Sequence, residues 1–236
     1  MTDVHIHILN GLDDGSRSVD ESLRILRELS LLGFTDVICT PHFVVGSDYC
    51  ANNITKNRCR EILQAAADAE GIKIKLHPGN EVFVDPEMGR FLALHRAQAM
   101  PDGRHVLFEM PFENMISGMG GIVADLKRQG YIPIVAHPER YAYFQENFEL
   151  ARKFHDLGVQ FQCNFGSAIG VFGSGAKKTL RRFLKAGLVD YLGTDIHRPK
   201  SEVVQNFAKI ERRIRRVAGS RGYAGILQNN ERLVKG

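Results

Sequence analysis

The chain has 236 residues, of which 44% are hydrophobic and 25% charged, and its formal net charge is +4 at pH 7. This composition is typical of a soluble globular protein, and we expect one domain over residues 1–236. The small net charge gives no reason to expect binding to nucleic acid or to membranes. The four cysteines form no C-x-x-C pair, and neither a signal segment nor an apolar run of about 18 residues is present. We therefore expect a reduced, cytoplasmic protein.

Strands and helices are expected to alternate along the chain. A strand opens it, over about residues 3–9. Ser18 and Glu21 then have the S-x-x-E spacing of a capping box, and leucines follow at helical spacing. Five later stretches each join an amphipathic segment that ends in Gly to an apolar, strand-like run, and "HVLFEM" (105–110) adds one more strand. The five stretches are 31–40, 69–77, 128–137, 156–164 and 185–194.

This alternation predicts an α/β protein built from βαβ units. Gly is preferred just past the end of a helix, and apolar strands without clean alternation indicate parallel strands buried on both faces. Seven parallel strands with intervening helices favour a closed or nearly closed barrel. An open doubly wound sheet is the alternative, because periodicity does not report closure. The basic run 209–217 is expected to be the solvated face of the last helix.

Histidines and acidic residues gather where the predicted strands end. In a parallel barrel these carboxyl ends form the active-site face, and imidazoles with carboxylates are ligands for divalent transition metals. His5 and His7 lie two apart on one strand and therefore point to the same side. Asp195 and His197 repeat this spacing on the last strand, which adjoins the first strand in a closed barrel. The remaining strand-end residues are His42, Glu81, Glu109, His137 and Arg140.

Each of these residues also has a purely structural interpretation. A lone strand-end histidine such as His42 is more often a cap or a core residue, and Asp13 and Asp14 of "LDDG" could simply make a turn. Glu109 is harder to assign to the core, because a buried carboxylate without a partner is costly. Five of the nine histidines fall at predicted strand ends, and this joint pattern favours a metal site. The other four, His77, His95, His105 and His155, are expected to pack or to occupy ordinary surface or helix positions.

In chain order, the motifs "HIH", "DDG", "TPH", "GNE", Glu109, "HPER" and "GTDIH" resemble the polymerase-and-histidinol-phosphatase (PHP) superfamily of metal-dependent phosphoesterases. Within it, "LDDGSRSVDES", "HPER" and "CNFGSAIGVFG" resemble the bacterial capsule and exopolysaccharide tyrosine-protein phosphatases of the CpsB/YwqE type, over nearly the whole chain. One departure is "GTDIH", where "SDAH" is commoner. The resemblance implies a distorted (β/α)7 TIM-like barrel that holds three divalent metals (Mn, Fe or Zn, with Mn favoured).

Carried over by position, the resemblance also implies the ligands. The first metal would bind His5, His7, Glu81 and Asp195. The second would bind Glu81, as a bridge, with Glu109 and His137. Asp14, His42 and His197 would hold the third. The list of ligands is more secure than their division among the three metals.

The predicted reaction is phosphomonoester hydrolysis by a metal-bridging hydroxide. The resemblance implies a phosphotyrosine protein as substrate, a bacterial tyrosine autokinase that regulates capsule synthesis. Arg140 is the leading phosphate ligand, because its planar guanidinium matches two phosphate oxygens; alternatively it forms an ion pair that orients Glu139 or another carboxylate. His42 or His197 could protonate the leaving group. Arg198 could bind phosphate, although an ordinary exposed loop arginine is the favoured interpretation.

A cysteine-dependent phosphatase is excluded, because that mechanism needs an arginine six positions after the cysteine. Those positions hold Val45, Lys56, Ala65 and Ile169. Three alternatives stay open. They are a histidinol-phosphate phosphatase of the same superfamily, an amidohydrolase, and a metal-stabilised adaptor without catalysis. The intact ligand set argues against the adaptor, because a structural metal site needs only four ligands.

The segment 164–173 could shape the substrate entrance, or it could be a loop that turns into a helix. Four aromatic residues beside the motifs could stack on a phosphotyrosine ring or only pack at the barrel rim: Phe43, Tyr141, Tyr143 and Phe172. The sequence leaves open the identity of the metal, the oligomeric state and the actual phosphoprotein.

Overall fold

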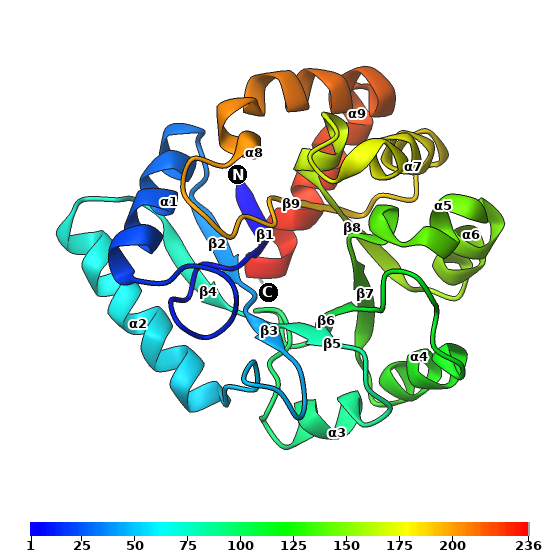
Figure 1. Ribbon diagram of the computed structural model, residues 1–236, viewed down its shortest axis with the longest axis horizontal. Coiled ribbons are helices and arrows are strands. Elements are labelled where there is room, and N and C mark those ends of the chain that lie inside the picture. The colour runs from blue at the N-terminus through cyan, green and yellow to red at the C-terminus, as the bar shows by residue number, and fades with distance from the viewer. Residues whose placement is uncertain (236) are drawn as a thin grey trace.

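Parallel strands form the centre of the molecule, and helices surround them (Figure 1). The structure is a computed structural model, which describes residues 1–235. The strands pair in the orders β1-β2-β4 and β3-β5-β6-β7-β8-β9. They are β1 (Thr2–Ile6), β2 (Asp36–Cys39), β3 (His42–Phe43), β4 (Lys75–Pro78), β5 (Glu81–Phe83), β6 (His105–Glu109), β7 (Ile132–Ala136), β8 (Gln160–Asn164) and β9 (Tyr191–Gly193).

These nine segments correspond to the seven predicted strands, because two strands are interrupted. β2 continues into β3 after Pro41, and β4 continues into β5 after Gly79 and Asn80. Proline has no N–H to donate to a neighbouring strand. A Cβ at Gly79 would lie 2.8 Å from the Ile38 side chain, so the two chains pass closely at the break. The partners are the same on both sides of it, since β2 pairs with β4 and β3 with β5.

The barrel closes between its first and last strands. The amide of Asp195 donates to the carbonyl of His5 at 2.8 Å, and the amide of His7 donates to the carbonyl of Ile196 at 3.1 Å. These bonds join β1 to the segment that follows β9. The predicted distorted (β/α)7 barrel is confirmed, and the open-sheet alternative is wrong.

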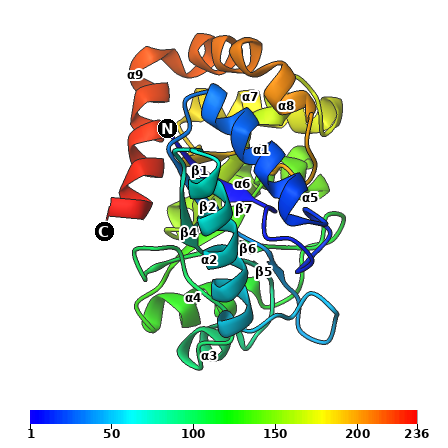
Figure 2. The same ribbon diagram turned by 90° about the vertical axis from the view of Figure 1, so that its left-hand side faces the viewer.

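The helices cover the outside of the barrel (Figures 1 and 2). They are α1 (Val19–Leu31), α2 (Asn53–Ala69), α3 (Met88–Ala93), α4 (Met119–Arg128), α5 (Ala142–Glu146), α6 (Phe148–Asp156), α7 (Gly173–Ala186), α8 (Glu202–Gln205) and α9 (Phe207–Lys235), with 3₁₀ turns η1 (Pro138–Arg140) and η2 (Phe165–Ala168). The five predicted helix-ending glycines all have positive φ: Gly33, Gly71, Gly130, Gly158 and Gly187. No helix within residues 1–235 combines the length and the apolar character needed to cross a membrane.

The expected cap of α1 is present in a modified form. The Ser18 hydroxyl accepts from the Glu21 amide at 3.2 Å, as a capping box requires. The Glu21 carboxylate, however, accepts from the amide of Arg17 at 2.9 Å, one residue before the cap. In α9 the basic run lies mainly on the exposed face, as predicted, because Ile210 and Ile214 are the residues that turn inward.

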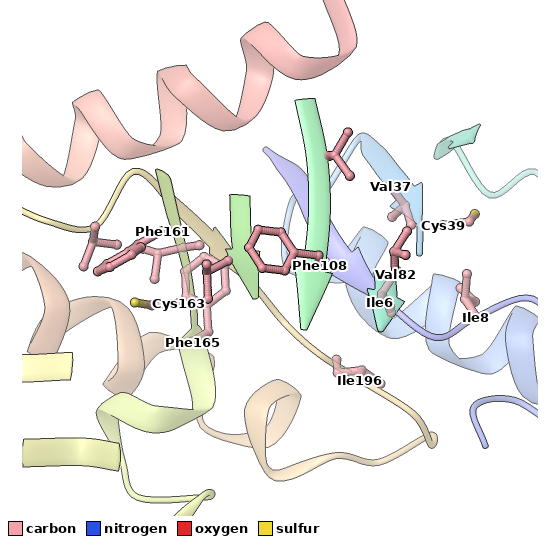
Figure 3. Packing of buried hydrophobic residues seen from close by; sticks show 14 of the residues in the cluster. Ile6, Ile8, Val37, Cys39, Val82, Phe108, Phe161, Cys163, Phe165 and Ile196 are labelled. Carbon is pink, nitrogen blue, oxygen red and sulfur yellow. The ribbon is translucent and has the colours of Figure 1, made fainter. Parts of the chain in front are cut away.

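Two apolar clusters stabilise the barrel. Between strands and helices lies the larger one, of which Figure 3 shows Phe108, Phe161 and Phe165. The smaller one contains Leu107, although its neighbours along β6 belong to the larger cluster, as the alternation of a strand requires. Leu233 of α9 joins the smaller cluster, and the side chain of Asn230 donates to the carbonyl of Thr2 at 3.0 Å. α9 therefore covers the amino end of the barrel, and the polar strand-end residues lie at the other end.

Candidate metal centre

The nine predicted metal ligands meet at the carboxyl end of the barrel, and we call them the polar cage. They are His5, His7, Asp14, His42, Glu81, Glu109, His137, Asp195 and His197. Seven of them line a cavity of about 320 Å³ together with Phe83, Phe112 and Arg140. His5 and His7 are fully buried. None of the four histidines predicted to lie elsewhere belongs to the cage; His77, for example, pairs with Asp36 at 2.8 Å.

The first predicted ligand group is closely assembled. The Nε2 atoms of His5 and His7 lie 3.1 Å apart, and they are 3.2 and 3.3 Å from Oε2 of Glu81. Oδ1 of Asp195 lies 3.7 and 3.6 Å from the same two nitrogens. The H-x-H spacing thus places both rings on one side of β1, and the last strand supplies the carboxylate opposite them.

The second and third groups share His42. Its Nδ1 lies 3.1 Å from both Glu81 and Glu109, and its Nε2 lies 3.5 Å from Asp14. His137 lies 2.9 Å from Glu81 but 4.0 Å from Glu109. His42, predicted only for the third metal, therefore faces the second group as well.

The third group is the most open part of the cage. Oδ1 of Asp14 lies 3.4 Å from Nε2 of His197, and the His197 ring stacks on His7 with centroids 4.0 Å apart. The Asp14 side chain is 53% exposed. A metal held by this group would therefore be the one most accessible to solvent and to substrate.

Two cage residues have an unusual backbone conformation. His137 and Asp195 have φ values of 34° and 53°, in the left-handed region. Histidine and aspartate visit this region more readily than most other residues. His137 directly follows β7 and Asp195 follows β9 after one residue, so the left-handed conformation redirects the chain where each side chain enters the cage.

The electrostatics of the cage are those of a cation site. Burial alone would lower the pKa of His7 and His42, but the carboxylates beside them, Asp13 and Glu81 at His7 and Glu109 and Glu81 at His42, raise these pKa values to about 10 and about 12. Burial alone would raise the pKa of Asp195, but His5, His137 and His7 lower it to about 2. Glu81, whose pKa neighbouring histidines also lower, and Asp195 therefore stay ionised and attract positive charge, which protons supply when no metal is bound.

The donor atoms also fit a metal. Nδ1 of His42 and Oε2 of Glu81 are buried, and neither has a hydrogen-bond partner within residues 1–235, although histidine nitrogens lie 3.1–3.3 Å from Glu81 Oε2. Leaving buried polar atoms unpaired is costly. A divalent cation among these atoms would pair both of them, and mixed imidazole and carboxylate ligands suit Mn, Fe or Zn.

Asp13, considered only as a turn residue in the sequence, holds two cage histidines in place. Its Oδ2 lies 2.7 Å from Nδ1 of His7 and accepts from the amide of His42 at 3.0 Å. Its Oδ1 accepts from the amide of Gly15 at 2.9 Å. Because Nδ1 of His7 faces a carboxylate, it carries the proton, and Nε2 is directed into the cage.

β8 supplies a second support that sequence analysis missed. Gln162 Oε1 lies 2.7 Å from Nδ1 of His5, and Gln162 Nε2 donates to Asn164 at 3.0 Å. Asn164 in turn donates to Oδ2 of Asp195 at 2.7 Å. Three amides in the strand "QFQCN", of which Gln162 and Asn164 are buried, were the available signal, because buried amides need partners.

Arg140 lies at the cavity wall between two aromatic rings. Its guanidinium is 4.7 Å from the centroid of Phe112 and 4.5 Å from that of Phe172. It donates to Oδ2 of Asp195 at 2.9 Å, which is the alternative ion pair with a carboxylate, although not with Glu139. The side chain is 26% exposed, so part of it faces the cavity.

The four aromatic residues named from the sequence divide between the two interpretations, packing and facing the site. Phe43 and Tyr141 are core residues, since both are essentially buried and the Tyr141 hydroxyl accepts from the amide of Met110. Tyr143 stacks on Tyr141 at 5.4 Å. Only Phe172, of the four predicted residues, touches Arg140. Two residues not predicted flank the cage instead, as Phe112 stacks on His137 and Tyr49 on His42, with centroid distances of 5.6 and 6.1 Å.

The segment 164–173 is anchored to the centre by Glu139. This buried carboxylate accepts from the amide of Asn164 at 2.8 Å and from the hydroxyl of Ser167 at 2.7 Å. η2 follows, and Phe172 then reaches Arg140. Arg198 is half-buried rather than freely exposed and donates to the carbonyls of Gly15 and His197, so it joins two loops beside the cage.

Comparison with known proteins gives consistent matches along the chain. The family described as capsular polysaccharide synthesis, CpsB/CapC, matches residues 1–235. Tyrosine-protein phosphatase YwqE of Bacillus subtilis is 30% identical over 207 residues, covering 85% of this chain and 79% of that protein. Tyrosine-protein phosphatase CpsB of Streptococcus pneumoniae is 27% identical over 207 residues, covering 84% and 83%.

Solved structures agree with these matches. Crystal structures of YwqE and CpsB, described as metal-dependent tyrosine phosphatases, include a chain that superposes with a TM-score of 0.90 at 27% identity, covering 100% of this chain and 94% of that one. A histidinol phosphate phosphatase of Lactococcus lactis shares the fold, with a TM-score of 0.57 at 15% identity and coverage of 91% and 94%. The chain therefore belongs to the CpsB/CapC family of capsular polysaccharide synthesis.

Proposed function

We propose that this protein is a metal-dependent protein-tyrosine phosphatase, and that its substrate is a phosphotyrosine protein, a bacterial tyrosine autokinase of capsule or exopolysaccharide synthesis. The observation that carries the proposal is the polar cage, in which imidazoles and carboxylates from six strand ends and a loop meet at a cavity open to solvent. The names of the relatives YwqE and CpsB support the substrate class.

The proposed cofactors are three divalent metal ions, with manganese favoured. His5, His7, Glu81 and Asp195 would hold the first, and Glu81 with Glu109 and His137 the second, with His42 also directed toward this group. Asp14, His42 and His197 would hold the third. Bound metals would supply Lewis acidity, which lowers the pKa of water and neutralises phosphate oxygens.

The side chains around the cage supply substrate binding. Arg140 would donate to the phosphate from a position that Phe112 and Phe172 fix on both sides. The exposed aromatic rim suits a tyrosine ring, because offset stacking on it adds contact area. Burial lowers the pKa of His197, and so does the charge of His7. His197 is therefore neutral in the metal-free site, whereas His42 is protonated there and would lose that proton on binding a metal. Either side chain could protonate the leaving group only while it is not bound to a metal.

Two alternative functions are weaker. A histidinol-phosphate phosphatase shares the fold, but the rim of Tyr49, Phe112 and Phe172 favours an aryl phosphate. An amidohydrolase often needs a lysine among its metal ligands, and no lysine lines the cavity within the described residues 1–235. The cytoplasmic location and the kinase partner stay predictions.

The test is hydrolysis of a phosphotyrosine peptide beside histidinol phosphate, after chelation and again after addition of Mn²⁺. We expect peptide hydrolysis that chelation abolishes and Mn²⁺ restores. His42→Ala should lose it, whereas the control His95→Ala, an exposed position outside the cage, should not. A preference for histidinol phosphate would show that the substrate is a small phosphate ester and not a phosphotyrosine protein. If the metal-loaded protein hydrolyses neither compound, the proposal is refuted.

A further inference from the structure

A groove lies between α7 and the first half of α9, outside the polar cage. Its volume is about 360 Å³. Leu180 and Leu184 of α7 and Ile214 and Val217 of α9 form an apolar floor, and Ala168 of η2 lies at one end. Leu180, Leu184 and Ile214 are almost fully buried and Val217 is half-buried, so the floor itself offers little exposed apolar area.

Five cations flank this floor. Lys177, Arg181 and Lys185 recur every four residues and therefore share one face of α7. Arg213 and Arg216 face them from α9. No acidic residue lines the groove, and within residues 1–235 none of the five cations lies within 4.0 Å of a carboxylate oxygen.

The acidic residues nearby do not neutralise this charge. α7 contains no acidic residue at all. In the first half of α9, Glu211 pairs with Arg215 at 3.6 Å and accepts from the hydroxyl of Tyr223 at 2.8 Å. The five groove cations are therefore available to a negatively charged partner.

The groove begins close to the rim of the active site. Arg213 donates to the carbonyl of Ala168 at 3.3 Å, at the end of η2. Phe172, which packs on Arg140, directly precedes α7. From Gly173 to Lys185 the helix rises about 18 Å. An extended peptide covers that distance in about six residues.

We propose that this groove binds an acidic segment of the phosphoprotein substrate, close in sequence to its phosphotyrosine. The five groove cations, unpaired within residues 1–235, select such a peptide by opposite charge. The position of the groove beside the rim of the active site favours a segment of the substrate over a membrane surface. No aromatic side chain lines the groove for stacking nucleic-acid bases. The inference rests on the proposed function, because it deepens the substrate class of the same active site.

The test compares two phosphotyrosine peptides that differ only in the residues after the phosphotyrosine. One carries alternating Glu and Leu over the next ten or so residues, and the other carries Ser at each Glu position. We expect kcat/KM to be about tenfold higher for the acidic peptide, through a lower KM. Arg181→Glu with Arg216→Glu should bring the ratio between the two peptides close to one.

The matched control is Lys178→Glu with Arg212→Glu. These positions are exposed on the same two helices, outside the groove, and the net charge changes equally. The control should keep the preference for the acidic peptide. If both double variants lose the preference for the acidic peptide equally, the proposal is overturned, because the preference would then be a general effect of net charge. Equal melting temperatures by circular dichroism establish that the variants are folded.

A binding measurement separates this inference from the proposed function. Fluorescence anisotropy of the unphosphorylated acidic peptide should show binding to the wild type and weaker binding to the groove variant. If the peptide binds in this way but no phosphotyrosine is hydrolysed, the assignment of the groove as a peptide-binding site is supported and the proposed function is refuted. If phosphotyrosine is hydrolysed without any preference for the acidic peptide, the proposed role of the groove is refuted and the proposed function is not. Groove-dependent binding to phosphatidylserine vesicles without peptide binding would also overturn it.

Discussion

Replacing Asp13 with asparagine should destabilise the metal-free protein and weaken metal binding, although the side chain has the same shape. Asp13 accepts three hydrogen bonds, from His7, from the amide of His42 and from the amide of Gly15. Asparagine has only one acceptor atom and one NH₂ group. In either orientation its NH₂ would face an N–H group, so at least one donor would lose its acceptor, and two would if the NH₂ replaces Oδ2.

The size of the effect follows from the environment of the carboxyl. Burial alone would raise the pKa of Asp13, but the bonds from His7, Gly15 and His42 lower it from 3.8 to about 2. The side chain is 0% exposed, so solvent does not screen these bonds. A shift of about two units corresponds to ~2.5 kcal/mol of stability. This contribution is present above the unfolded pKa and is lost as the pH falls through about 2.

Urea unfolding of the chelated protein at pH 7 measures this loss. We expect Asp13→Asn to lower the free energy of unfolding by about 2–3 kcal/mol and to weaken Mn²⁺ binding about 10- to 100-fold. Asp20→Asn is the control, because its ion pair with Arg24 lies on the surface and should contribute at most about 1 kcal/mol. If Asp13→Asn unfolds like the wild type and binds Mn²⁺ equally well, the assigned role of Asp13 is wrong.

Further predictions concern the backbone, the guanidinium and the protons of the site. A Cβ at Gly193 would lie 2.6 Å from the Cβ of the first histidine of β1, so Gly193→Ala should lower kcat at least about tenfold. Gly120→Ala is the control, because a Cβ at that position meets no atom within 4 Å, and it should leave kcat unchanged. Equal kcat values for the two variants would contradict the packing argument. Arg140→Lys should lower kcat/KM about 100-fold at unchanged metal content; an unchanged rate would remove Arg140 from phosphate binding. His7 and His42, with pKa values of about 10 and about 12, are protonated at pH 7 without metal. Calorimetry in buffers of different ionisation enthalpy should therefore show that about two protons are released when Mn²⁺ binds. The number of released protons should decrease as the pH rises through about 10. If no proton is released at pH 7, the two histidines are not protonated in the metal-free protein.

The sequence predicts the barrel and the members of the cage well, because both depend on short-range spacing. The H-x-H pair lies on one face of a strand for geometric reasons, and helix-ending glycines are visible without a structure. The role of Asp13 was not predictable in this way. Asp13 and Asp14 are neighbours in one turn, and only the path of the loop directs Asp14 into the cage and Asp13 behind His7.

Long-range packing decided the other differences. Whether an aromatic residue beside a strand end faces the core or the rim depends on the twist of the barrel, so Phe43 lies in the core and Phe112 at the rim. The second contact of His42 arises because β3 pairs with β5 so that His42 lies opposite Glu81, which spacing along one strand does not reveal.

The most direct test of the central claim is to titrate Mn²⁺ into the chelated protein and to measure bound metal and phosphotyrosine hydrolysis together. The account predicts no hydrolysis by the metal-free protein, and activity that rises with occupancy to a limit at about three ions per chain. Full activity in protein that holds no metal would contradict the account.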